Sequence, residues 1–118
     1  IESELRIAHD IQLGMVPKQF VPTLGAECVD IHAVLCPARQ VGGDLYDYLM
    51  LNEDEFGFAV GDVSGKGVPA SLFMATTISQ IRSLALQDTS LNYIMNLMNQ
   101  SLCRTGNTNM FITFFAGY

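Results

Sequence analysis

Apolar positions recur along the chain with two spacings, which predict helices and extended segments in a grouped order. A spacing of three to four residues predicts amphipathic helices over residues 1–15 and 69–86, and a third from about residue 90 to Gly106. Alternating or continuous apolar positions predict extended segments over 27–38, 45–51, 56–63 and 110–118. The order helix, strand, hairpin, two helices, strand favours an α+β fold with an antiparallel sheet.

The extended segments 45–51 and 56–63 are predicted to form a hairpin about Asn52–Asp54. In this register Leu51 faces Glu55, and the pairing continues until Asp44 lies opposite Asp62. Side chains alternate between the two faces of a strand, so both acids share one face with the aromatic residues between them. We expect that aromatic-rich face to be the core face. A turn longer by one residue would place the two acids on opposite faces.

Two opposed carboxylates lie close together, because directly opposed Cβ atoms are about 4.5–5.5 Å apart. Like charges repel, and burial raises the pKa of each carboxyl group. A divalent cation removes both costs and prefers oxygen ligands. Asp44 and Asp62 are therefore candidate catalytic metal ligands, and the backbone carbonyl of Val63 can face the same cation. The alternative is that Asp62 only caps a tight turn.

The residues around these acids suggest further roles. Gly61, Gly65 and Gly67 would let the backbone approach a bound group, and the N-terminus of the following helix offers N–H groups to an anion such as phosphate. Asp47 points away from Asp44 on a regular strand, so we expect it behind the direct ligands, with Gly43, or at the surface. Arg39 could hold a phosphate with its guanidinium group, or it could be an exposed loop arginine.

Composition narrows the class of protein. The chain has 118 residues, 49% hydrophobic and 15% charged, with a net charge of −6, which excludes disorder and disfavours nucleic-acid binding. Three cysteines without a Cys-x-x-Cys pattern suggest neither a zinc site nor a disulfide framework. Neither a signal peptide nor an apolar run of about 20 residues is found, so a cytoplasmic location is expected, with any membrane attachment elsewhere in a longer protein.

The two ends of the sequence suggest a longer protein. The sequence begins inside a predicted helix, without a capping residue, and the last predicted strand has no turn or partner after it. We therefore expect at least one missing strand partner. An exposed sheet edge would favour a homodimer or segment exchange between chains.

Three motifs together resemble one bacterial family. They are Ile-Gln-x-x-Met-Val-Pro, Pro-Ala-Arg-Gln-Val-Gly-Gly-Asp-Leu-Tyr-Asp and Gly-Asp-Val-Ser-Gly-Lys-Gly-Val-Pro-Ala. This pattern resembles the PPM-type (PP2C-like) serine/threonine phosphatases of the SpoIIE/RsbU class. The resemblance implies an αββα sandwich, of which this chain is roughly the first half: an antiparallel sheet with two packed helices. Residues 1–16 would be a linker or regulatory helix, and residues 17–118 the N-terminal portion of the phosphatase domain.

The resemblance also implies a chemistry. Two Mn²⁺ or Mg²⁺ ions would lie between the sheets of the complete domain, with Asp44, Asp62 and the Val63 carbonyl among their ligands. The substrate would be a phosphoserine or phosphothreonine protein, typically an anti-sigma-factor antagonist of the STAS type, and an upstream sensor domain would control activity. Family members supply further aspartates beyond this point, so we expect the fragment to be incomplete and inactive alone. The alternatives are a non-catalytic binding module of the same fold and an unrelated α+β domain.

Overall fold

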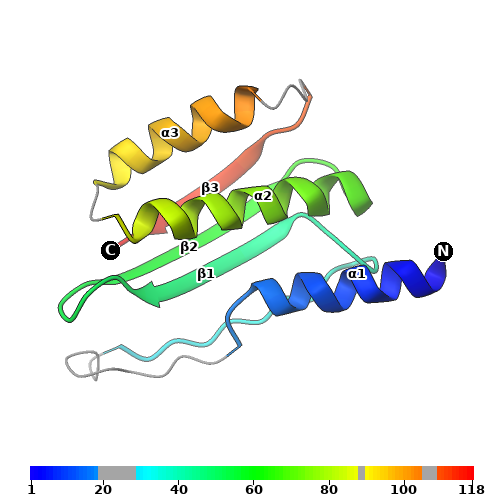
Figure 1. Ribbon diagram of the computed structural model, residues 1–118. Coiled ribbons are helices and arrows are strands. Elements are labelled where there is room, and N and C mark those ends of the chain that lie inside the picture. The colour runs from blue at the N-terminus through cyan, green and yellow to red at the C-terminus, as the bar shows by residue number, and fades with distance from the viewer. Residues whose placement is uncertain (19–28, 88–89, 105–108) are drawn as a thin grey trace.

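The fold combines a small antiparallel sheet with helices packed on one of its faces. The computed structural model describes residues 1–18, 29–87, 90–104 and 109–118. Within them the elements are α1 (Glu2–Met15), β1 (Asp44–Met50), β2 (Phe56–Val63), α2 (Gly67–Ala85), α3 (Leu91–Arg104) and β3 (Ile112–Gly117). The strands pair antiparallel in the order β1-β2-β3. Helices α2 and α3 cover one face, and α1 lies alongside α2 (Figure 1). The predicted α+β fold is confirmed.

The hairpin has the register that the sequence predicts. Asp44 pairs with Asp62, and the pairs continue without a bulge to Met50 opposite Phe56. The turn closes with a hydrogen bond of 2.8 Å from the Leu51 N–H to the Glu55 carbonyl oxygen. The Asn52 side chain accepts a hydrogen bond from the Asp54 N–H and donates one to the Glu55 carboxylate. These local contacts explain why the turn has no extra residue.

The predicted strand over 27–38 is wrong for the part that the structure describes. Residues 29–38 form no strand, and residues 27 and 28 lie outside the described residues. The alternation itself is present, because Val29, Ile31, Ala33 and Leu35 are partly buried whereas the residues that follow each of them are exposed. Alternation reports only an extended backbone with one side turned inward, whereas a strand also needs a neighbouring edge with which to exchange hydrogen bonds.

The core lies on the face of the sheet opposite to the one we predicted. Leu45, Ala59 and Val63 pack with residues of α2 and α3, among them Ala70, Met74, Ile78, Ile94 and Met98. On the aromatic face, the rings of Tyr46, Tyr48, Phe56, Phe58 and Phe115 form a continuous series of contacts. Tyr48 is buried there, but Val60 and Phe115 remain 56% and 68% exposed. The closest approach of a helix on this face is at Gly43, where an added Cβ atom would lie 3.1 Å from the Ala70 Cβ of α2.

The helix ends follow local backbone chemistry. Helix α2 begins at Gly67, two residues before the predicted start, directly after a corner in which Gly65 and Gly67 have φ of +81° and +74°. Such angles strain residues that carry a Cβ atom. The Ser90 hydroxyl accepts a hydrogen bond of 3.2 Å from the Tyr93 N–H and so caps α3. The predicted closing residues Gly106 and Asn107 lie outside the described residues. Among the helices described, none has the length and apolar character needed to cross a bilayer.

Candidate metal and phosphate site

The two predicted ligands meet at one end of the hairpin. Asp44 begins β1 and Asp62 lies opposite it near the end of β2, so both side chains project from the face away from α2 and α3. They line a hollow together with Arg39, Lys66 and the glycines at 42, 43 and 65. Partial burial, followed by the hydrogen bond and the negative charge of Asp62, raises the pKa of Asp44 above its ordinary value of 3.8. The Asp44–Asp62 pair thus lacks a nearby positive charge sufficient to offset the repulsion between the two carboxylates.

The donor set fits part of a site for a hard divalent cation. Two directly opposed carboxylates are suitable oxygen ligands for Mg²⁺ or Mn²⁺. No group of three or more His, Cys, Asp or Glu side chains with metal-binding geometry occurs within the described part of the chain. Such cations usually take about six ligands, so the remaining ligands must be water, backbone oxygen or groups from elsewhere.

Gly43 explains how the two acidic ends come so close. A Cβ atom added at Gly43 would lie 2.9 Å from the Val63 Cβ, 3.0 Å from the Val63 carbonyl oxygen and 3.1 Å from the Ala70 Cβ. The Val63 N–H donates to the Gly43 carbonyl oxygen at 3.1 Å. Only glycine therefore allows the residue before β1 to pack this closely against the end of β2 and the first turn of α2. The Val63 carbonyl as a metal ligand stays a prediction.

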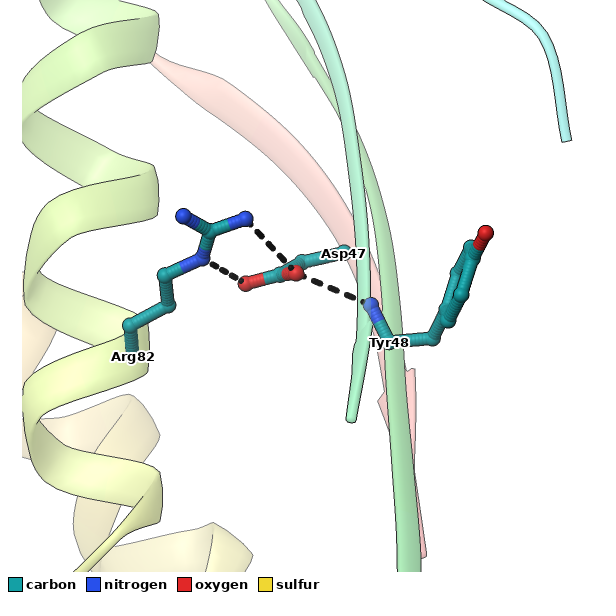
Figure 2. Close-up of polar contacts among 3 residues, drawn as sticks. All are labelled: Asp47, Tyr48 and Arg82. Atoms are coloured by element: carbon teal, nitrogen blue, oxygen red, sulfur yellow. Dashed lines mark hydrogen bonds and ion pairs between the residues drawn. The ribbon is translucent and has the colours of Figure 1, made fainter. Parts of the chain in front are cut away.

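Asp47 occupies the other side of the sheet, where it contacts α2 (Figure 2). It is 5% exposed, so it is not a surface acid. Arg82 donates to it twice, from Nε to Oδ2 at 2.7 Å and from Nη2 to Oδ1 at 3.1 Å. The Tyr48 N–H donates a third hydrogen bond to Oδ1 at 3.0 Å. Asp47 therefore joins β1 to the last turn of α2, and any effect it has on Asp44 passes through the strand.

Two positive side chains accompany the carboxylates. Arg39, the predicted phosphate-binding residue, lines the hollow from the segment before β1. Lys66 lines it from the corner after β2 and was not singled out by the sequence analysis. Its position between two glycines with positive φ, directly before a helix, was the signal that could have identified it. Cations beside a metal-binding pair are suited to phosphate oxygens, which carry several negative charges.

Thr113 and Gln12 also lie at the site without having been predicted there. Thr113 pairs with Asp62 in the sheet, and its hydroxyl donates to the Asp62 carbonyl oxygen at 3.3 Å. The buried Gln12 side chain donates to the Gly42 carbonyl oxygen at 2.5 Å and accepts from the Gly42 N–H at 3.0 Å. Helix α1 is thereby fastened to the backbone two residues before Asp44. The only sequence signal was a glutamine on the apolar stripe of the helix.

Comparisons with known proteins support the family resemblance that the sequence motifs suggest. The sequence model of the family described as "Stage II sporulation protein E (SpoIIE)" matches residues 52–118. "Phosphoserine phosphatase RsbU" of Bacillus subtilis is 32% identical over 119 residues, which cover 100% of this chain and 34% of the relative. "Protein IcfG" of Synechocystis sp. is 46% identical over 79 residues, which cover 67% of this chain and 12% of that relative.

The antiparallel α+β sheet with helices on one face is consistent with part of a PP2C-like domain. The chain belongs to the SpoIIE family. It spans about a third of the length of RsbU and about an eighth of IcfG. The resemblance drawn from the motifs is confirmed, and the alternative of an unrelated α+β domain is excluded.

Proposed function

We propose that this chain is the N-terminal portion of a metal-dependent protein serine/threonine phosphatase domain. Its substrate would be phosphoserine or phosphothreonine on a bacterial regulatory protein, of the STAS type that antagonises an anti-sigma factor. The observation that carries the proposal is the opposed pair Asp44 and Asp62 in a hollow that also contains Arg39 and Lys66. The similarity to the phosphoserine phosphatase RsbU supports the same reaction class.

In the proposed chemistry, the metal ions and the side chains have different roles. Two Mn²⁺ or Mg²⁺ ions, when bound, would lower the pKa of a water molecule and stabilise the charge that develops during attack on phosphorus. Asp44 and Asp62 would hold the cation with carboxylate oxygens. Arg39 and Lys66 would orient the phosphate by charge-assisted hydrogen bonds. Gly43 would keep the two acidic strand ends in contact.

The described residues supply only part of such a centre, so we propose that the chain is inactive without the remainder of its domain. The second candidate is a regulatory module of the same family that binds phosphoproteins without hydrolysing them. It is favoured by the absence of a three-ligand group among the described residues. The two candidates differ in whether the full-length protein releases phosphate.

The test is Mn²⁺-dependent phosphate release by the full-length protein from a phosphoserine protein substrate. Asp62→Asn removes one negative ligand and should lower kcat by roughly a hundredfold or more, the scale of losing one group that stabilises transition-state charge. Asp30→Asn makes the same chemical change at an exposed position of the segment before β1 and serves as the matched control. Equal activity of the two variants would contradict the assignment, and absence of activity in the wild type would favour the binding module.

We also propose that residues 1–16 transmit a signal from an upstream sensor domain to the portion 17–118. The support is the contact of Gln12 with Gly42, which connects α1 directly to the backbone leading into Asp44. Gln12→Leu in the full-length protein should uncouple phosphate release from the sensor. Activity that still follows the sensor in this variant would count against the proposal.

A further inference from the structure

A second hollow adjoins the carboxylate pair on the side of α1. Its lining consists of residues of α1 and of the segment before β1: Glu2, Arg6, His9, Ala38, Arg39 and Gln40. Ala38 and Arg39 also line the hollow that contains Asp44 and Asp62. The two hollows are therefore neighbours, and Arg39 lines both.

The placement of α1 creates this second hollow. The His9 Nδ1 atom lies 2.5 Å from the Gln40 carbonyl oxygen, within hydrogen-bond distance. One turn further along the helix, Gln12 binds Gly42 through both its amide atoms. Residues three apart lie on the same side of a helix, so Arg6 comes one turn before His9 on the side that faces Arg39. The contacts of α1 with Gln40 and Gly42 thus place Arg6 at the edge of the hollow that contains Asp44 and Asp62.

The charge of this surface differs from that of the chain as a whole. The chain carries 6 Lys and Arg against 12 Asp and Glu. Arg6, Arg39 and Lys66 all line these neighbouring hollows, and none of them forms an ion pair within the described part of the chain. In the first hollow the cations face Asp44 and Asp62. The second hollow has Arg6 and Arg39 against one acidic residue, Glu2, which lies four residues before Arg6 on α1. Unpaired cations on an acidic protein attract an acidic partner selectively, because the rest of the surface repels it.

We propose that Arg6, His9 and Arg39 form a docking subsite for an acidic residue of the substrate protein beside its phosphorylated serine or threonine. The inference rests on the proposed phosphatase function, because it places the phosphate in the adjoining hollow. Because the two hollows are neighbours at Arg39, one extended peptide can reach both. A membrane surface is a poorer occupant, since recognition of anionic lipid generally uses four to eight clustered basic residues.

The test measures hydrolysis of two phosphopeptides by the full-length protein. One peptide has acidic residues around the phosphoserine, and the other has alanine in their place. The wild type should have a lower KM for the acidic peptide. Arg6→Gln should raise that KM roughly two- to fivefold, as expected for one exposed ion pair, and leave kcat and the KM for the neutral peptide unchanged. Lys18→Gln removes the same charge just beyond the other end of α1 and should change neither KM. High salt should reduce the preference.

Two results would overturn the subsite. Equal KM values for both peptides in the wild type would remove it while leaving the proposed function intact, and so would equal effects of Arg6→Gln and Lys18→Gln. If neither peptide is hydrolysed, the proposed function fails separately. Fluorescence anisotropy of the same labelled peptides then decides the docking, because the acidic peptide should bind the wild type more tightly than it binds Arg6→Gln. Equal binding would overturn the inference.

Discussion

The contact between Arg82 and Asp47 provides a quantitative prediction of stability. Arg82→Met keeps most of the side-chain volume but removes two hydrogen bonds from a carboxylate that is 5% exposed. Breaking a buried ion pair by removing one partner costs about 3–5 kcal/mol. Arg82 is itself 42% exposed, so water can replace part of its contact. We therefore expect a loss of about 2–3 kcal/mol, a large share of the ~5–15 kcal/mol typical of a folded domain.

The partner substitution should cost less, which makes the prediction sharper. Asp47→Asn can still accept the hydrogen bond from the Tyr48 N–H, and it leaves a charge on the half-exposed Arg82, which water can solvate. The expected loss is about 1 kcal/mol, that of one ordinary hydrogen bond. Arg104→Met, at an exposed position at the end of α3, is the matched control and should stay within about 0.5 kcal/mol of the wild type.

The assay is equilibrium urea unfolding followed by far-ultraviolet circular dichroism, with the free energy of unfolding extrapolated to zero urea. The order of losses should be Arg82→Met, then Asp47→Asn, then Arg104→Met. A loss within about 0.5 kcal/mol for Arg82→Met would refute the reasoning, because substitutions without a structural role fall in that range. A larger loss for Asp47→Asn than for Arg82→Met would refute the claim that the buried partner carries the penalty.

Three further predictions concern α1, the carboxylate pair and the aromatic face. Gln12→Leu should lower the free energy of unfolding by about 1–3 kcal/mol, because the partly buried Gly42 N–H and carbonyl lose their hydrogen-bond partner. An unchanged urea midpoint would contradict this. The folded state raises the pKa of Asp44 above 3.8, so it binds this proton more tightly than the unfolded chain, and stability should fall as the pH rises through the interval above 3.8. Asp44→Asn should remove this decline of stability with pH, and it should also remove any stabilisation of the fold by added Mn²⁺. Thermal melts of the variant with the same pH dependence as the wild type would oppose this prediction. Phe115→Ser should shift the isolated chain toward monomer in sedimentation velocity, because Phe115 is 68% exposed and exposed apolar side chains favour association. A wild type that is already monomeric at high concentration would contradict this prediction.

Local information was sufficient for the site pair because the hairpin is a local structure. Its turn is closed by Asn52, Asp54 and Glu55 within a few residues. From there the period of two carries the register to Asp44 and Asp62 without any distant contact. The same argument failed for residues 29–38, where alternation was read correctly but the segment pairs with neither outer edge of the β1-β2-β3 sheet. A strand is a property of two segments, and only one of them is visible in a local pattern.

The amino-acid sequence by itself determined the helices, the hairpin register, the paired carboxylates and the family. Only the tertiary structure decided which sheet face is the core, that Asp47 is neutralised by Arg82, and that Gln12 and Arg6 reach the surroundings of Asp44. Arg82 lies 35 residues from Asp47, and Gln12 lies 30 residues from Gly42. Periodicity describes which side of an element is apolar, but the partner of a polar side chain depends on how elements distant in sequence pack together, and a local pattern does not contain that information.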